Sequence, residues 1–197
     1  MFAASGDEAD AASLVSADDT VIAALAAETF ACRLKAKVAH TPVIAVGTDA
    51  RPTGPAIADA MLRALLAHSV AVRYAGVIAA PEIMAYARDF DGFVYISASH
   101  NPIGHNGIKF GFDDGGVLDR DENAALVADF EERCADPQAR QHASALMGRC
   151  PAARLDWAYA EQEAVKQQAL SVYRAFAKRT IAATDDRAES PLFISIK

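Results

Sequence analysis

The stretch "TPVIAVGTDARPTGPAIADAMLRALLAHS", residues 41–69, holds a strand pattern followed directly by a helix pattern. Its first part contains a run of mostly branched apolar residues over 43–46 that is ended by a glycine, as expected of a buried strand. In its second part Ile57, Met61 and Leu65 recur every four residues, as on the buried side of a helix. The stretch therefore predicts one strand–helix unit of an α/β layer.

The segments on either side continue this alternation. Upstream, a helix is expected to begin near Thr20 with Asp19 as its cap, after a loop over residues 1–18. Downstream, two further strands are predicted, and the helix between them begins with a proline at a favourable first-turn position: strand 70–76, helix 81–90 and strand 92–98. The order helix, strand, helix, strand, helix, strand predicts an α/β fold with a mainly parallel sheet.

The remaining sequence is more helical. A hairpin or edge strand is predicted over 107–119 and a helix over 121–134, whereas residues 137–150 fit neither pattern. From Arg154 to about Ala183 the pattern predicts one long helix. One stripe of this helix holds Ala169, Tyr173, Phe176, Ala177 and Thr180. A turn and a short closing strand, "LFISI", would follow.

Composition excludes some classes of partner. The chain has 197 residues, is 52% hydrophobic and carries a formal net charge of -7 with no basic cluster, which disfavours nucleic acid and anionic membranes as partners. No apolar run is long enough for a membrane span, and the N-terminus lacks the features of a secretory signal. Three cysteines without metal-ligand spacing are interpreted as free thiols in a reducing compartment. We therefore expect a cytoplasmic protein.

The candidate chemistry lies in "YISASHNPIGHNGIKF", residues 95–110. Ser99 stands where a strand gives way to a loop, and ligands of open α/β sheets bind outside the carboxyl ends of the strands. The loop is rich in turn-forming residues, and Lys109 follows close enough to return to the same pocket. A hydroxyl that can accept a phosphoryl group, beside an ammonium that offsets its charge, favours phosphoryl transfer. Plain turn chemistry explains the same residues, and that alternative stays open from the residues alone.

Two segments resemble a known family, the α-D-phosphohexomutases (phosphoglucomutases and phosphomannomutases). "SASHNPIGHNGIKF" is similar to the family's phosphoserine loop, with Ser97 in place of the usual threonine and His105 in place of a common tyrosine. "VGTDARPTG" resembles an upstream G-x-D-x-R-x-S/T-G segment through Gly47, Asp49, Arg51, Thr53 and Gly54. The clear resemblance covers residues 42–133. It implies a three-layer α/β/α domain, followed here by the long helix.

The resemblance also implies an activity. Phosphate would move between O1 and O6 of a hexose phosphate, with bound Mg²⁺ and a hexose 1,6-bisphosphate as intermediate and activator. Ser99 would carry the phosphoryl group and bind the metal through its phosphate, while Lys109 would be a general acid/base candidate or phosphate neighbour. The other implied site residues are His100, Asn101, Asn106, Gly107 and Arg51. Asp49 and Arg51 could equally form a structural ion pair that anchors the loop.

The sequence departs from the family in what it lacks. No D-G-D-x-D-R metal loop, sugar-selecting loop or distal phosphate loop is found, and "FAASGD" keeps only Ser5 and Gly6 of an N-terminal G-T-S-G-x-R segment. We therefore expect a phosphohexomutase domain I over 1–150, the long helix and linker over 151–190, and the first strand of a truncated second domain over 191–197. Expected partners are a hexose phosphate and the missing domains, with self-association left open.

Two alternatives to this enzyme remain. The first is a binding or scaffold module that has lost catalysis and associates through the aromatic stripe of the long helix. The second is a serine hydrolase, which fits less well because the nucleophile-elbow pattern G-x-S-x-G is absent around Ser99.

Overall fold

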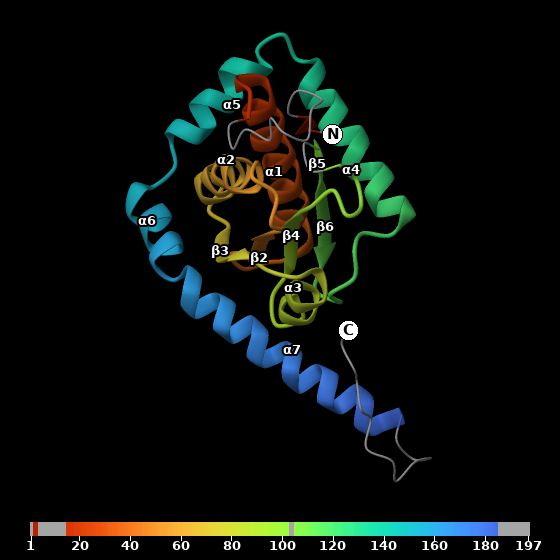
Figure 1. The fold of residues 1–197 in the computed structure, drawn as a ribbon. Helices are drawn as coiled ribbons and strands as arrows, with labels where there is room; N and C mark the ends of the chain where they lie inside the picture. Colours follow the sequence, from red (N-terminus) through yellow and green to blue (C-terminus); the bar gives the residue numbers. More distant parts are fainter. Residues whose placement is uncertain (1, 4–14, 103–104, 185–197) are drawn as a thin grey trace.

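The computed structural model describes residues 2–3, 15–102 and 105–184, and its centre is a four-stranded sheet (Figure 1). The strands are β2 (Val43–Thr48), β3 (Ala71–Val77), β4 (Gly92–Ile96) and β6 (Ile108–Phe112). They lie in the order β3-β2-β4-β6, with the first three parallel and β6 antiparallel to β4 at the edge. This confirms the predicted mainly parallel mixed sheet.

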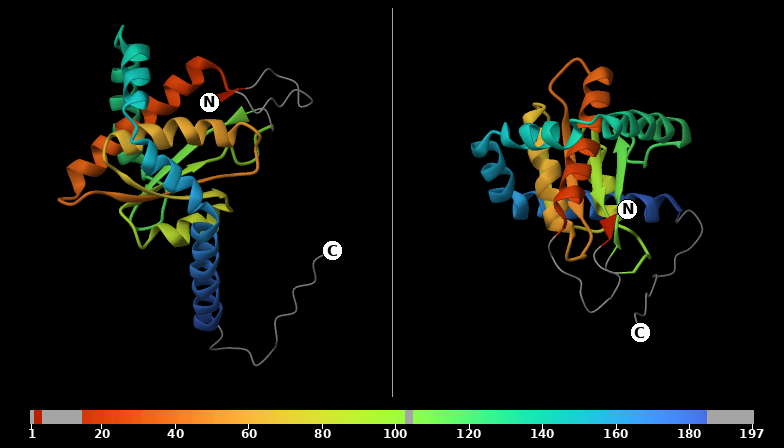
Figure 2. Two further views of the ribbon diagram at one scale, coloured as in Figure 1. Left: turned by 90° about the vertical axis from the view of Figure 1, so that its left-hand side faces the viewer. Right: turned by 90° about the horizontal axis from the view of Figure 1, so that it is seen from above.

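Helices cover both faces of this sheet, so the predicted three-layer fold is confirmed. On one face lie α1 (Ala17–Lys37) and α2 (Gly54–Ala67), and on the other lie α3 (Ala80–Ala87) and the first part of α7 (Gln162–Thr184) (Figure 2). The remaining helices continue around the body: α4 (Arg120–Ala135), α5 (Ala139–Gly148) and α6 (Ala152–Ala160). Both α4 and α5 pack on α1, while α6 lies against α2 and β3.

The side chains of β4 show why the sheet needs two covers. Val94 and Ile96 belong to the core beneath α1 and α2, whereas Phe93 and Tyr95 belong to the core beneath α3 and α7. All four are buried, as expected of a strand whose alternate residues face opposite covered surfaces. The predicted helical stripe of Ile57, Met61 and Leu65 is likewise fully buried.

The beginning of the chain corrects two predictions. A two-residue strand, β1 (Phe2–Ala3), pairs antiparallel with β5 (His105–Asn106), where the sequence predicted a loop. The cap of α1 is Ser16 and not Asp19. The Ser16 hydroxyl accepts the Asp19 N–H at 3.0 Å while the Asp19 carboxylate accepts the Ser16 N–H, a reciprocal capping box that starts the helix at Ala17.

The predicted long C-terminal helix is present as α7, but it does not begin at Arg154 as predicted, because the chain turns at Glu161 between α6 and α7 (Figure 1). The turn lets α7 lie on the far face of the sheet, where Val165 and Ala169 are buried against α3. Gly76 has a φ of 64° and lies so close to Gln162 that an added Cβ would meet the Gln162 side chain at 2.4 Å. Close packing at the start of α7 therefore accompanies the break.

Other predictions have mixed outcomes. The undecided residues 137–150 contain α5, and residues 107–119 form the edge strand β6 but no hairpin. The three cysteines are free thiols, as predicted. The predicted closing strand over 192–196 lies outside the described residues. Among the helices of the described residues, none has the length and apolarity needed to cross a membrane.

A buried carboxylate joins the helices on one side of the sheet. Glu28 of α1 is 3% exposed and is contacted by the imidazoles of His68, at 3.0 Å, and His142, at 2.8 Å, with Arg133 at 3.8 Å. Burial alone would raise the pKa of Glu28, but the hydrogen bonds from His68 and His142, with the nearby charges of His142 and Arg133, lower it to about 2. Glu28 therefore ties α2, α4 and α5 to α1.

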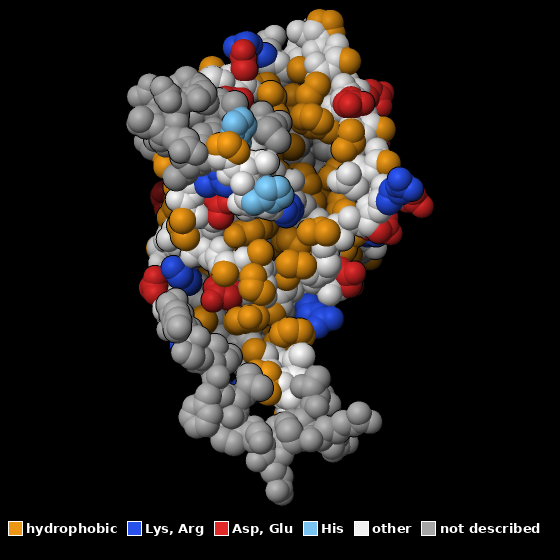
Figure 3. Space-filling view, turned by 45° about the vertical axis from the view of Figure 1, so that its right-hand side comes forward, with side chains coloured by type: hydrophobic (Ala, Val, Ile, Leu, Met, Phe, Trp, Pro, Cys, Tyr) orange, Lys and Arg blue, Asp and Glu red, His pale blue; other side chains and the backbone are white. Residues whose placement is uncertain are grey.

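A groove of about 290 Å³ separates α1, β6 and α4 on the outside of the sheet edge. Its lining is mainly apolar and includes Ile22, Ile108, Phe110, Val127 and Phe130. Ile22 of α1 is 39% exposed in this groove. Figure 3 shows hydrophobic side chains gathered along the face on which β6 and α4 lie.

Candidate active site

Two loops meet where β2 and β4 end. Thr48 of β2 and Ile96 of β4 are register partners, and the backbone N–H of Asp49 donates to the carbonyl of Ile96 at 2.9 Å. The chain leaves β2 through α2 toward β3, on one side of β2, and returns through α3 to β4, on the other side. This strand order makes the crevice between β2 and β4 the topological switch point, the usual ligand position in an open α/β sheet.

Ser99 and Lys109 are brought together above this crevice. The Lys109 ammonium donates to the Ser99 Oγ at 2.9 Å and to the Ser97 carbonyl at 3.0 Å. Lys109 reaches Ser99 because β6 runs back antiparallel beside β4, which places Lys109 opposite Tyr95 in the ladder. The sequence-based prediction that the lysine returns to the pocket of the serine is borne out geometrically, while the catalytic roles of both remain predictions.

Ser99 has an unusual backbone. Its φ is 57°, in the left-handed region that non-glycine residues rarely occupy. The Ser99 N–H donates to the Ser97 Oγ at 3.1 Å, and the Ser99 carbonyl accepts from Arg51 at 3.0 Å. The Ser99 side chain thus stands exposed on a strained residue that is held from three directions: at its N–H, its carbonyl and its hydroxyl.

The charge state of Lys109 responds to its surroundings. Burial lowers the pKa of Lys109 below its ordinary value, the positive charge of Arg51 lowers it further, and the negative charge of Asp49 acts in the opposite direction. The ammonium also lies 5.7 Å from the centre of the Tyr95 ring. A lysine with a lowered pKa beside a hydroxyl is suited to exchange a proton with it.

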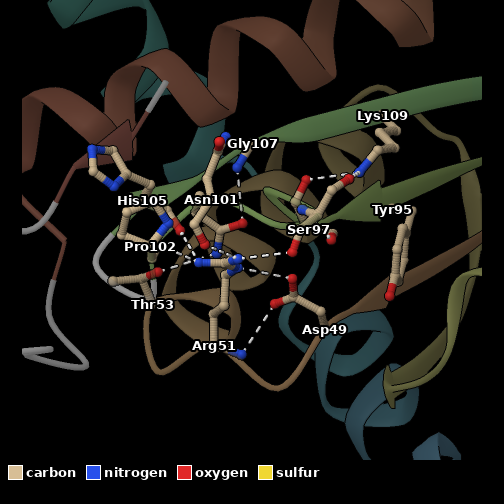
Figure 4. Close-up of polar contacts among 12 residues, drawn as sticks. Asp49, Arg51, Thr53, Tyr95, Ser97, Asn101, Pro102, His105, Gly107 and Lys109 are labelled. Carbon is tan, nitrogen blue, oxygen red and sulfur yellow. Dashed lines mark hydrogen bonds and ion pairs between the residues drawn. The ribbon is translucent and has the colours of Figure 1, made fainter. Parts of the chain in front are cut away.

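Arg51 lies beneath the serine loop, with 10% of its side chain exposed (Figure 4). Its Nε donates to the Asp49 carboxylate at 3.0 Å, and Asp49 also accepts the backbone N–H of Arg51 at 3.0 Å. The two terminal nitrogens donate to four carbonyl oxygens of the loop, those of Ser99, Asn101, Pro102 and His105. Both interpretations of Asp49 and Arg51 were open in the sequence, and the ion pair with a loop anchor is the geometry found.

Asn106 and Gly107 connect the loop to the fold. Asn106 is fully buried, and its amide donates to the Thr53 hydroxyl at 3.1 Å while its Oδ1 accepts the Gly107 N–H at 2.9 Å. The Gly107 carbonyl in turn accepts the Ser97 N–H at 2.9 Å. These contacts tie the end of the loop to the start of α2, so Asn106 and Gly107 support the loop rather than line its outer surface.

The remaining predicted site residues are less engaged. His100 is exposed, and in the described part of the chain its side chain has no hydrogen bond or ion pair. Asn101 contributes its backbone, since its N–H donates to the Ala98 carbonyl at 3.1 Å and its carbonyl accepts from Arg51. The structure therefore gathers Ser99, Lys109 and Arg51 and leaves the His100 side chain in solvent.

Ser97 is the residue whose role the sequence missed. Its hydroxyl accepts from Ser99 and its carbonyl accepts from Lys109, so it orients both members of the candidate pair. The family motif has a threonine at the position of Ser97, and both residues offer a hydroxyl there. This shared hydroxyl was the feature of the sequence that could have indicated the role of Ser97.

The described residues around the crevice do not form a metal site by themselves. Among the described residues, no group of three or more His, Cys, Asp or Glu side chains could hold a metal ion. The Asp49 carboxylate beside the crevice is already paired with Arg51. The described residues therefore do not by themselves fit Mg²⁺, although a phosphate on Ser99 would offer oxygens to it.

Comparisons with known proteins show the family to which this fold belongs. The family model described as "Phosphoglucomutase/phosphomannomutase, alpha/beta/alpha domain I" matches residues 9–135. The phosphoglucosamine mutase of Parafrankia sp. (strain EAN1pec) is 36% identical over 112 residues, which are 56% of this chain and 23% of the relative. That of Staphylococcus carnosus (strain TM300) is 35% identical over 97 residues, 48% of this chain and 22% of the relative. The chain thus spans less than a quarter of the length of these relatives.

A solved structure shows the same fold. The phosphoglucomutase/phosphomannomutase family protein of Burkholderia thailandensis superimposes with a TM-score of 0.50 and 22% identity, over 60% of this chain and 27% of that one. The family model covers most of the chain, including both loops of the crevice. The chain belongs to the phosphoglucomutase/phosphomannomutase family and carries its α/β/α domain I.

Proposed function

We propose that this chain supplies the phosphoserine loop of a phosphohexomutase, with Ser99 carrying the phosphoryl group between O1 and O6 of a hexose phosphate. The observation that carries this proposal is the 2.9 Å contact between the exposed Ser99 Oγ and the Lys109 Nζ, at the carboxyl ends of parallel strands. Family membership supports it, since the matched region contains both residues.

The chemistry follows from the contact. In the first half-reaction the phosphorus–Oγ bond of phosphorylated Ser99 breaks, a bond from phosphorus to a sugar hydroxyl oxygen forms, and that hydroxyl loses its proton to water. Ser99 Oγ takes up a proton, which Lys109 is placed to supply. In the second half-reaction Ser99 Oγ attacks the other phosphate of the hexose 1,6-bisphosphate, the bond between that phosphorus and the sugar oxygen breaks, and the sugar oxygen takes up a proton from water. Ser99 Oγ gives its own proton to Lys109, which is neutral after the first half-reaction; its lowered pKa favours this neutral form.

Mg²⁺ enters this proposal only through the phosphate that Ser99 would carry. Bound there, the ion would offset negative charge on the transferring group. The described residues supply no cluster of three or more His, Cys, Asp or Glu side chains that could hold the ion.

The substrate is proposed to be a hexose phosphate, with glucosamine phosphate tested first. The two relatives named above are phosphoglucosamine mutases. Glucose and mannose phosphates are the other sugars to compare, because the family's sugar-selecting loop has no counterpart in this sequence.

We also propose that the 197 residues alone do not interconvert hexose phosphates. In-line transfer of a highly charged group requires a fixed sugar, a metal and a second phosphate site, and losing two of these leaves background rates. The test compares this chain with a chimera, in which the matched region of this chain replaces the matched 112 residues of the Parafrankia enzyme. The chimera should turn over glucosamine phosphate and the chain should not.

A matched control isolates the serine. Ser99→Ala should abolish turnover by the chimera, while Ser69→Ala should leave it intact. Ser69 is also exposed and also has a left-handed backbone, with a φ of 61°, but it lies at the turn after α2. Turnover by the Ser99→Ala chimera at the rate of the unmodified one would remove Ser99 from the carrier role.

An association module is the second candidate. Trp157 is 49% exposed and Tyr159 is 39% exposed, and the groove between α1, β6 and α4 presents further apolar surface. This function predicts self-association of the purified chain that Trp157→Ala weakens, measured by sedimentation velocity. A chain that stays monomeric at high micromolar concentration would argue against self-association.

A further inference from the structure

The carbonyl oxygens of Ser99, Asn101, Pro102 and His105 all point to one guanidinium group. We infer that Arg51 is a positioning residue that shapes the Ser99 loop by collecting these oxygens, and that it does not bind the substrate phosphate. The inference rests on the proposed function of Ser99 as the phosphoryl carrier. The effect of Arg51 on the conformation of the Ser99 loop can nevertheless be measured without turnover.

Arg51 has no donor left for a ligand. A guanidinium carries five N–H groups in a planar fork, and five acceptors receive them here: the Asp49 carboxylate and the four loop carbonyls. Asp49 fixes the base of the fork through the Nε contact. A phosphate could reach Arg51 only by displacing these contacts.

The direction of the carbonyls matters for an anion. Carbonyl oxygens carry partial negative charge, so any that faced a phosphate on Ser99 would repel it. Arg51 turns four of them toward itself and away from such a phosphate.

Arg51 also helps to hold the strained serine. Ser99 keeps a φ of 57° while its carbonyl is bound to Arg51, its N–H to Ser97 and its hydroxyl to Lys109. Without Arg51 the carbonyl is released, and the backbone can relax toward the negative φ values that L-residues prefer. The hydroxyl would then leave the position in which Lys109 reaches it.

Lysine cannot replace this fork. An ammonium is a single point with three donors, whereas the loop presents four carbonyls around a plane. Arg51→Lys therefore retains the charge and loses the geometry, and Arg51→Ala loses both. Arg88→Lys is the matched control, because Arg88 also donates to a backbone carbonyl, that of Asp114, away from the crevice.

The experiment records backbone and Cβ chemical shifts of Ser99 in the isotope-labelled 197-residue chain by NMR. Both Arg51 variants should lose the left-handed signature of Ser99 and the Ser99–Lys109 contact, and Arg88→Lys should retain both. Guanidinium ion at millimolar concentration should restore the signature in Arg51→Ala, and methylammonium should not. An unchanged Ser99 in folded Arg51→Ala would overturn the inference.

Titration with inorganic phosphate separates the two roles of Arg51. In the unmodified chain the Arg51 side-chain N–H signals should not shift on addition of phosphate. Phosphate-dependent shifts of those signals, with weaker phosphate binding in Arg51→Lys and an unaltered Ser99, would make Arg51 a ligand and refute the inference. None of these readouts needs phosphoryl transfer, so failure of the proposed function would appear separately, as a Ser99→Ala chimera that still turns over.

Discussion

The left-handed backbone of Ser99 can be tested by comparing Ser99→Gly with Ser99→Ala. Both substitutions remove the hydroxyl and its contact with Lys109, so the difference between them isolates the backbone. At a φ of 57° alanine is disfavoured by about 1–2 kcal/mol, whereas glycine is not. Glycine loses about 0.5–1 kcal/mol more conformational freedom on folding, which leaves Ser99→Gly more stable than Ser99→Ala by roughly 0.5–1 kcal/mol.

Two other serines frame this comparison. Ser69 has the same backbone region, so its glycine variant should also be the more stable of the pair. Ser144 is exposed within α5, where glycine is less favourable than alanine by about 1 kcal/mol. The preference should therefore reverse at Ser144, which makes the two sites differ by about 1.5–2 kcal/mol.

Equilibrium unfolding in urea, followed by circular dichroism, measures these differences directly. A chain of this size should show a shift in Tm of about 2–4 °C for each kcal/mol. If Ser99→Ala proved as stable as Ser99→Gly while Ser144 behaved as expected, the strained backbone at Ser99 would be refuted.

Three further predictions concern the support of the site. Because the pKa of Glu28 is lowered from its ordinary value of 4.5 to about 2, ionised Glu28 stabilises the fold at pH values above 4.5. This contribution, up to about 3 kcal/mol, should be lost as the pH falls from about 5 to 2. In urea titrations at different pH values, Glu28→Gln should remove this loss of stability between pH 5 and 2. Asn106→Ala should lower the free energy of unfolding by about 1–3 kcal/mol, because it leaves the buried Thr53 hydroxyl unpaired. Asn123→Ala, an exposed control on α4, should change this free energy by less than about 1 kcal/mol. Equal effects of the two substitutions would contradict a stabilising hydrogen bond between Asn106 and Thr53. Gly76→Ala should destabilise the chain by more than about 1 kcal/mol in thermal unfolding, since its Cβ would meet Gln162 at a φ of 64°, whereas Gly148→Ala, with no atom within 4 Å of its added Cβ, should not.

Much of the fold was predictable because apolar residues recur at the periods of helix and strand. The alternation of elements and the buried stripe of α2 follow from that pattern, and both are found. The break at Glu161 was not predictable, since no glycine or proline marks it and helical periodicity continues on both sides. The position of the break is set by the tertiary packing of Val165 and Ala169 of α7 beneath the sheet.

Part of the candidate site was likewise predictable from the sequence, and part was not. The approach of Lys109 to Ser99 follows from a short loop between adjacent strands, which the sequence indicates. The contacts of Arg51 with the loop do not follow from the sequence, because its partners are mostly backbone carbonyls. The direction of a backbone carbonyl cannot be predicted from the identity of its residue. The exposure of His100 was equally hidden, since a motif position does not specify which way its side chain points.

The most direct measurement of the central claim is the site of phosphate on the chimera after incubation with hexose 1,6-bisphosphate and Mg²⁺. Intact-mass analysis followed by peptide fragmentation should show a single phosphate on Ser99 in the unmodified chimera and in its Ser69→Ala variant, and none in Ser99→Ala. A chimera that turns over substrate while its phosphate lies on another residue, or a Ser99→Ala variant that gains the same mass, would contradict Ser99 as the phosphoryl carrier.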